Sequence, residues 1–295
     1  MIRAVGVIGL GIMGSAISAN LVRAGFATFG YDIAARRRNG LHRAGGVALR
    51  SAAETLAQAP LVITSLPSVD ALKSVVRELA AQRRRGAIVL ETSTLPIDDK
   101  LRARRALAAA GITLLDCPLS GTGAQAKTRD LSVYASGPRK AYRAAIPVFV
   151  GFARSHYYLG GFGNGSRMKF VANLLVAIHN VSAAEAFVLG MKAGLSPRLV
   201  YQVAGDGAGT SRMFQVRGPM MVAGRYAKAT MTNAMWQKDM KIIGEFAARL
   251  GAPTPLFKAS AKIYARAMKR GFADADTAAV CAVLETMARV KRRNA

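Results

Sequence analysis

A lysine and an asparagine four residues apart have the side chains needed to handle the proton of an alcohol. Lys169 and Asn173 occupy positions i and i+4 of an apolar stretch with helical character, so they share one face with about 6 Å of axial rise between them. Oxidising an alcohol requires a hydride acceptor and a base for the hydroxyl proton, and a redox cofactor supplies only the acceptor. We expect Lys169 to be the general acid/base and Asn173 to orient the hydroxyl. For a single helical lysine, the alternative is a solvated surface charge.

The rival base on the same stretch is His179. It lies ten residues after Lys169, which on a helix is about 15 Å further along the axis. That distance is too long for both side chains to act on one atom, so we interpret His179 as a helix-packing residue.

A G-x-G-x-x-G pattern, GLGIMG at positions 9–14, stands directly after an apolar run and before a helical one. In that context Gly9 permits the tight turn, Gly11 lets the backbone approach a pyrophosphate, and Gly14 allows close helix packing. The helix begins with Ile12 and Met13, whose backbone N–H groups are available to an anion. The pattern predicts a dinucleotide-binding loop, the alternative being a chance glycine-rich turn.

Asp32 ends the second apolar run, at the distance where a carboxylate accepts hydrogen bonds from both ribose hydroxyls of NAD. The 2′-phosphate of NADP would meet like charge there, at a cost of roughly 1–4 kcal/mol for a separation of about 4 Å. Three arginines follow at 36–38, and they either offset that repulsion or form the exposed start of a helix. We predict NAD as the cofactor, with NADP possible.

Two further strand ends are expected at the same crevice, since ligands of doubly wound sheets bind beyond the carboxyl ends of the strands. Leu66 and Pro67 follow one strand and are predicted to press on the cofactor. Thr94 follows the next and offers a hydroxyl to the nicotinamide ribose. Lys238, in the sequence WQKD, is a candidate to reach the cofactor or the substrate.

Small residues after a later strand predict a site for the substrate carboxylate. Ser120, Gly121 and Thr122 belong to the segment DCPLSGTG. Consecutive backbone N–H groups beside small side chains bind anions, and Ser120 adds a hydroxyl donor. The alternative is a plain turn.

These candidates lie on a chain whose first half alternates short apolar runs with helical patterns. Such alternation predicts an α/β fold, a Rossmann domain with a doubly wound, mainly parallel sheet. After a glycine cluster at 160–165 the β-type patterning stops and helix follows helix. We predict an NAD(P)-binding domain over residues 1–163 and an all-α substrate and oligomerisation domain over residues 164–295. The expected strands are 4–8, 28–31, 61–65, 87–92, 113–116 and 131–135, and the expected helices of the first domain are 12–24, 52–59, 69–81, 96–110 and 138–152.

Composition limits the expected partners. The 295 residues carry a formal net charge of +26, but the arginine clusters are spread along the chain without a nucleic-acid-binding motif. We interpret them as solvated faces and expect no specific nucleic acid. The two cysteines have neither disulfide nor metal spacing, which favours a reducing compartment, the cytoplasm. The apolar stretch 171–191 carries Asn173, His179, Asn180 and Glu185, so we expect no membrane span.

Together these residues resemble the β-hydroxyacid dehydrogenase family, which includes 3-hydroxyisobutyrate dehydrogenase, tartronate semialdehyde reductase and L-threonate dehydrogenase. The resemblance covers almost the whole chain. The matching segments stand in the order and spacing of the family and are VGVIGLGIMGSAISANL, SLP, ETSTLP, DCPLSG, GFGNGSRMKFVANLL and WQKDM.

The resemblance implies hydride transfer between a nicotinamide and a small anionic β-hydroxy acid or its semialdehyde. It also implies a homodimer or homotetramer built through the helical domains. The residue roles that it implies are a catalytic lysine at Lys169, a substrate-orienting asparagine at Asn173, substrate-carboxylate contacts from Ser120, Gly121 and Thr122, and a cofactor contact from Lys238.

The sequence departs from the family pattern around the substrate loop. Thr122, Gln125 and the run 129–131 stand where family members commonly have glycines and a threonine, which predicts a bulkier pocket lip or an altered carboxylate grip. Two other functions stay open. An imine reductase has similar architecture but usually lacks the lysine. A non-catalytic dinucleotide sensor associated with nucleic acid would use the basic charge but give Lys169 and Asn173 no role.

Overall fold

The computed structural model describes residues 2–290 and 292, and the chain divides into two compact units, Met1–Lys169 and Phe170–Ala295. The extreme ends of both predicted domains, at residues 1 and 293–295, lie outside the described residues. Helix α8 (Asn164–Lys192) begins in the first unit and ends in the second. Because one continuous helix crosses the division, the predicted boundary between residues 163 and 164 stays a prediction.

The first unit is built on a parallel sheet of six strands. These strands are β1 (Ala4–Ile8), β2 (Ala27–Tyr31), β3 (Val47–Ala48), β4 (Leu61–Thr64), β5 (Ile88–Glu91) and β6 (Thr113–Asp116). Their order in the sheet is β3-β2-β1-β4-β5-β6. Strands β2 and β3 are added on one side of β1, and β4 to β6 are added on the other side, so the order of winding reverses between β1 and β4. Ligands of doubly wound sheets bind at such a reversal, beyond the carboxyl ends of the strands. The predicted fold class is confirmed.

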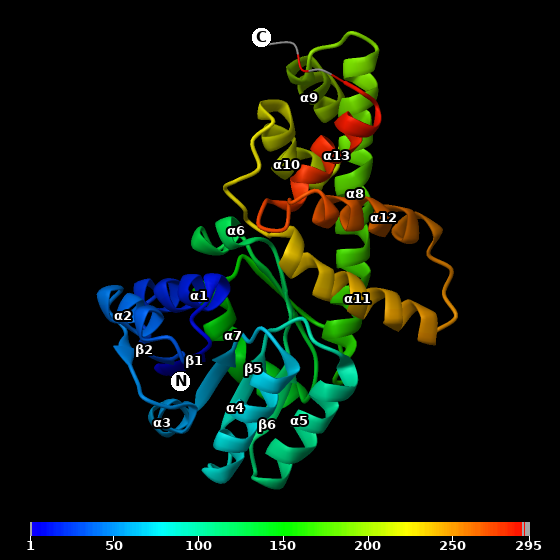
Figure 1. Cartoon of the computed structure of the whole chain (residues 1–295). Helices are drawn as coiled ribbons and strands as arrows, with labels where there is room; N and C mark the ends of the chain where they lie inside the picture. The colour runs from blue at the N-terminus through cyan, green and yellow to red at the C-terminus, as the bar shows by residue number, and fades with distance from the viewer. Residues whose placement is uncertain (1, 291, 293–295) are drawn as a thin grey trace. The chain divides into compact units, whose positions relative to one another are not determined.

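Helices cover both faces of this sheet because successive strand residues point into two different cores. One core joins Val5 and Val7 of β1 to α1 (Ile12–Arg23) and α7 (Arg139–Phe152). The other core joins Val62 and Val89 to helices on the opposite face, which are α3 (Ala52–Gln58), α4 (Val69–Ala81) and α5 (Ile97–Ala109). Figure 1 shows α4 and α5 side by side, in direct contact.

The first unit contains several short elements that the sequence did not predict, and one predicted strand pairs differently. The predicted strand 131–135 does not join the main sheet, because β8 (Ser132–Ala135) pairs with β7 (Leu119–Ser120) and β9 (Ser155–Tyr158) in a separate small sheet. Residue alternation reports an extended segment, whereas the choice of partner depends on packing. Helix α2 (Ala35–Arg43) is not among the expected helices. Leu41 is its one buried residue, so the segment has no apolar periodicity that would predict a helix.

The second unit is helical throughout its regular elements. Besides the later part of α8, they are α9 (Pro197–Asp206), α10 (Arg212–Ala223), α11 (Asn233–Arg249), α12 (Pro255–Lys269), the short 3₁₀ helix η1 (Thr277–Ala279) and α13 (Val280–Met287). Three of the helices begin at a hydroxyl side chain that accepts a backbone N–H of the first turn. These N-caps are Ser196, Ser211 and Thr232, and each satisfies a donor that the helix itself leaves unpaired.

The buried amides of α8 are paired with other parts of the second unit. Asn173 donates to Asp239, and Asn180 donates to the hydroxyl of Tyr264 and the carbonyl of Thr277. Among the described residues, α8 is the one helix with the length and hydropathy to cross a bilayer, and 44% of its most apolar window is buried. Core helices of soluble proteins meet the same criterion, and paired amides of this kind are typical of a core helix.

Candidate functional site

The glycine loop after β1 has the shape that its spacing predicts. Gly9 has a φ of +88°, and a Cβ added at Gly14 would lie 1.8 Å from the carbonyl oxygen of Gly9. The protein itself therefore needs glycine at both positions. At Gly11, by contrast, an added Cβ would meet no described atom within 4 Å. That open space, at the residue that caps the N-terminus of α1, is where a pyrophosphate needs room.

Asp32 is held directly against this loop. One carboxylate oxygen accepts the backbone N–H of Leu10 at 2.7 Å, and the other accepts that of Ala34 at 2.9 Å. The guanidinium of Arg37 lies 3.2 Å from the same carboxylate, and Arg38 donates to the backbone carbonyl of Asp32. The run 36–38 is thus both the exposed start of α2 and a source of positive charge beside Asp32. Together the loop and this carboxylate fit a nicotinamide dinucleotide, and Asp32 is the residue that would hold its ribose.

The loops after β4 and β5 are tied to each other. The backbone N–H of Leu66 donates to the hydroxyl of Ser93 at 2.8 Å, and the backbone N–H of Ser93 donates to Glu91 at 2.9 Å. Both loops follow carboxyl ends of neighbouring strands, so Leu66, Pro67 and Thr94 lie at the same edge of the sheet as the glycine loop. The first unit therefore brings together the predicted cofactor residues that it contains.

The predicted carboxylate loop contains a helix cap that was not predicted from the sequence. Ser120 ends β7, Gly121 has a φ of +131°, and Thr122 is the N-cap of α6 (Gly123–Lys127). The side chain of Gln125 accepts the backbone N–H of Thr122 at 2.9 Å, while the hydroxyl of Thr122 accepts the N–H of Gln125. The signal was present, because threonine followed three residues later by glutamine is a capping-box pattern. Since its N–H is already bonded, the donor that Thr122 retains for an anion is the O–H of its side chain.

Lys169 lies one turn after a tightly anchored helix start. Ser166 donates both its backbone N–H and its hydroxyl to the buried carboxylate of Asp116, at 2.8 Å each. A Cβ at Gly165 would lie 2.3 Å from the carbonyl oxygen of Tyr134, so only glycine allows this approach. The first turn of α8 is thereby fixed against the carboxyl ends of β6 and β8, and Lys169 follows it at half-buried depth.

In the second unit, Asn173 and Lys238 meet at one carboxylate. Asn173 is 4% exposed and donates to Asp239 at 3.0 Å, and the amine of Lys238 lies 3.3 Å from the other oxygen of Asp239. Asp239 belongs to the WQKDM segment, but the sequence predicts no role for it. Sequence spacing could not supply one, because Asp239 and Asn173 are 66 positions apart. On α8 itself, Lys169 and Asn173 are separated by one helical turn, as their spacing predicts.

In the part of the chain that the structure describes, the cysteines and acidic side chains form neither a reactive thiol nor a metal site. Cys117 and Cys281 are buried free thiols, and burial raises the pKa of both, that of Cys281 to about 12. Neither thiol is therefore poised as a nucleophile. Among the described residues, no group of three His, Cys, Asp or Glu side chains is placed to hold a metal ion.

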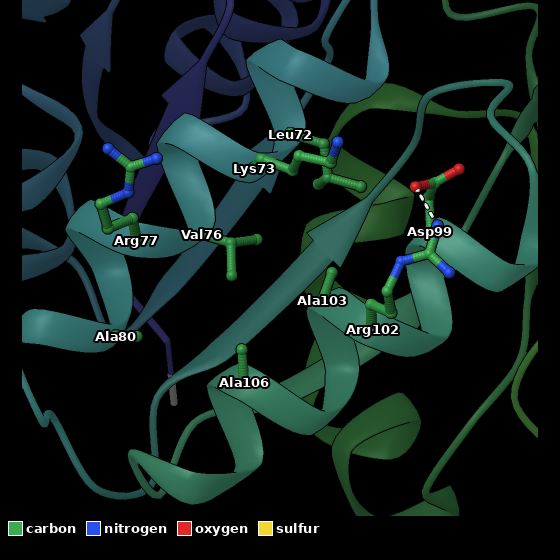
Figure 2. Close-up of a pocket in the computed structure, with 9 residues that line it drawn as sticks. All are labelled: Leu72, Lys73, Val76, Arg77, Ala80, Asp99, Arg102, Ala103 and Ala106. Carbon is green, nitrogen blue, oxygen red and sulfur yellow. Dashed lines mark hydrogen bonds and ion pairs between the residues drawn. The ribbon is translucent and has the colours of Figure 1, made fainter.

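A separate cavity of about 320 Å³ lies between α4 and α5 (Figure 2). Its floor is aliphatic, with Val76 and Ala103 on facing helices. Lys73, Arg77 and Arg102 line it as well, and Arg102 is paired with Asp99 at 2.6 Å. None of the predicted site residues contributes to its lining.

Both parts of the chain match family models. The model described as the NAD-binding domain of 6-phosphogluconate dehydrogenase matches residues 4–160. A second model, described as "NAD-binding of NADP-dependent 3-hydroxyisobutyrate dehydrogenase", matches residues 163–284.

Individual relatives are similar over nearly their full length. An L-threonate dehydrogenase of Cupriavidus necator is 32% identical over 95% of both chains. A solved 3-hydroxyisobutyrate dehydrogenase of Salmonella typhimurium is 29% identical, with a TM-score of 0.86 over 95% of this chain and 99% of that one. The Mycobacterium tuberculosis 3-hydroxyisobutyrate dehydrogenase, solved with L-serine, is 30% identical with a TM-score of 0.86 over 96% and 99%.

Proposed function

Because the chain belongs to the NAD(P)-dependent β-hydroxyacid dehydrogenase family, oxidoreductases acting on CH–OH groups, we propose that it interconverts a small β-hydroxy acid and the corresponding semialdehyde or keto acid. One structural observation supports the proposed role of Lys169 in addition to the family membership. Within the first unit, the bond between Asp116 and Ser166 fixes the start of α8 at the sheet edge that also holds the glycine loop. Lys169, one turn later, is the basic side chain that the chemistry requires there.

Each proposed role follows from the chemistry of its side chain. A nicotinamide held by the glycine loop and Asp32 would supply the hydride acceptor for oxidation and the hydride donor for reduction. Lys169 takes the hydroxyl proton during oxidation and returns it during reduction. Asn173 orients the hydroxyl, and its own amide is oriented by Asp239. Ser120, Gly121 and Thr122 hold the substrate carboxylate, Ser120 and Thr122 through their hydroxyls and Gly121 through its backbone N–H, and the cap made by Thr122 shapes the loop.

The proposed substrate class follows the names of the relatives. L-threonate and 3-hydroxyisobutyrate are both small hydroxy carboxylates, and L-serine is a hydroxylated amino acid of similar size. All three present a carboxylate and a hydroxyl separated by a short carbon skeleton. A site with one anion loop and one acid/base fits that pattern.

NAD is the proposed preferred cofactor, since Asp32 stands where a 2′-phosphate would lie. Arg37 keeps NADP usable by partly balancing that charge. The ratio of kcat/KM for the two cofactors measures the preference, and a clear advantage for NADP would contradict this use of Asp32.

The deciding experiment for the activity is turnover with a panel of L-threonate, 3-hydroxyisobutyrate, L-serine and D-glycerate, followed by nicotinamide absorbance. We expect hydride transfer with at least one of these acids. Reduction of a cyclic imine without turnover of any acid would replace the proposal by an imine reductase. Tight binding of nucleic acid without any hydride transfer would replace it by a sensor.

We also propose that the protein forms a homodimer or homotetramer and that it is located in the cytoplasm. Val171, Leu175 and Leu189 on α8 are large apolar side chains that are at least 46% exposed in the single chain. Light scattering during size-exclusion chromatography measures the mass, and a strict monomer would contradict this part.

A further inference from the structure

A buried lysine lies between two buried carboxylates at the carboxyl ends of β5 and β6. Lys100, in the first turn of α5, has no exposed surface. Its amine is 2.6 Å from Glu91 and 2.9 Å from Asp116, and neither of these carboxylates has exposed surface either. Glu91 and Asp116 are register partners at the ends of β5 and β6. Without Lys100, two negative charges would face each other on adjacent strands with no water to screen them.

The cationic form of Lys100 is the stable one. Burial by itself lowers the pKa of this amine, but attraction to Asp116 and Glu91 outweighs burial and leaves the pKa above its usual value. The cluster therefore consists of one cation and two anions, and its geometry is fixed by direct contacts at both carboxylates.

Each carboxylate connects Lys100, through hydrogen bonds, to a different part of the proposed site. The second oxygen of Glu91 accepts the N–H of Ser93, whose hydroxyl accepts the N–H of Leu66 in the proposed cofactor loop. Asp116 accepts both donors of Ser166, one turn before Lys169. We call these connections the cofactor arm and the α8 arm.

From this arrangement we infer that Lys100 is a positioning residue, whose amine sets the placement of the cofactor loops and of the acid/base helix together. The inference rests on the proposed function for the role of Lys169. It assigns Lys100 no contact with substrate or cofactor. Lys100 acts through the carboxylates of Glu91 and Asp116. Without the cation between them, these two carboxylates would repel each other and change position.

Two serine variants separate the arms while leaving the ion cluster intact. Ser93→Ala removes the acceptor for Leu66, so NADH should bind about fivefold more weakly, with kcat at saturating cofactor nearly unchanged. Ser166→Ala removes one of the two bonds to Asp116, so kcat should fall about tenfold with NADH affinity nearly unchanged. Lys100→Met should show both effects.

Ser155→Ala is the matched control, because it removes the 2.8 Å bond between the hydroxyls of Ser155 and Ser132 in the same unit but outside the cluster. NADH affinity is measured by fluorescence titration. Hydrogen exchange of the amides at 92–94 and 165–169 is measured on the whole protein. We expect faster exchange at 92–94 in Ser93→Ala, at 165–169 in Ser166→Ala, and at both segments in Lys100→Met.

Two results would overturn the inference. In the first, both serine variants match Ser155→Ala in affinity, kcat and exchange. In the second, Lys100→Met lowers Tm but keeps wild-type NADH affinity and kcat, which would make Lys100 purely structural. If Lys100→Met does not fold, the serine variants decide. If the wild type turns over no hydroxy acid, the proposed function fails, while NADH affinity and exchange still decide the positioning role.

Discussion

Asn173 donates its side-chain N–H to Asp239 across 3.0 Å, at a depth where its own side chain is almost fully buried. A buried amide with a charged acceptor has one preferred orientation, so Asp239 determines which way Asn173 presents its remaining donor and acceptor. The proposed substrate-orienting residue is therefore itself oriented.

Asp239→Ala should lower kcat/KM about tenfold or more and reduce stability by about 1–3 kcal/mol, since it leaves the buried N–H of Asn173 unpaired. Asp239→Asn, which keeps an acceptor oxygen, should recover part of the activity. Steady-state kinetics and thermal unfolding measure the two effects. Glu245→Ala, at an exposed position of the same helix, is the control. Equal activity in Asp239→Ala and Glu245→Ala would exclude the orienting role.

Lys169→Ala should reduce kcat by about 10²–10⁴-fold, the usual contribution of a general acid or base, with little change in NADH affinity. Lys192→Ala, at an exposed position in the last turn of the same helix, should behave as the wild type. Rapid kinetics and cofactor titration measure the two quantities. Loss of NADH binding with kcat preserved would assign Lys169 to the cofactor instead.

Gly11→Ala and Gly14→Ala should differ in their effects on Tm, although both should weaken NADH binding. A methyl group at Gly11 meets open space, so the fold should keep its Tm while NADH binding weakens about tenfold or more through contact with the pyrophosphate. A methyl group at Gly14 would overlap the carbonyl of Gly9, so the Tm should fall together with affinity. Gly40→Ala is the control, since it also meets no described atom within 4 Å and lies in α2. Unchanged affinity in Gly11→Ala would place the dinucleotide elsewhere.

Acid should destabilise the second unit through Asp276. Burial alone raises the pKa of this carboxyl, but Arg217 at 3.0 Å and the backbone N–H groups of Ala278 and Thr230 outweigh burial and lower it below its ordinary value of 3.8. A carboxyl with a lowered folded-state pKa stabilises the protein above its unfolded pKa, and this contribution disappears as pH falls through the folded value.

The Tm should therefore fall as the pH drops below about 4. Asp276→Asn should lower the Tm at pH 7 and weaken its dependence on acid. Asp274→Asn, at an exposed position two residues away, should leave both unchanged. An acid dependence of Asp276→Asn equal to that of the wild type would assign the acid sensitivity to other carboxyls.

The sequence by itself determined the features that depend on short spacing. The glycines at 9, 11 and 14 specify a turn whose geometry depends on the missing side chains of those same residues, and the structure has that turn. Alternating apolar runs and helices predicted the parallel sheet, because residue periodicity reports which face of a strand or helix is buried. Lys169 and Asn173 were paired by the helical repeat alone.

Tertiary structure decided which distant residues share a buried charge. In the sequence, Lys100 resembles the other lysines and arginines of a basic chain, yet it is fully buried between Glu91 and Asp116. Asp239 becomes the partner of Asn173 across 66 positions, and the strand at 132–135 joins a second sheet instead of the first. Such pairings depend on how elements pack, because a buried charge takes the nearest compensating group in space, whatever its distance along the chain.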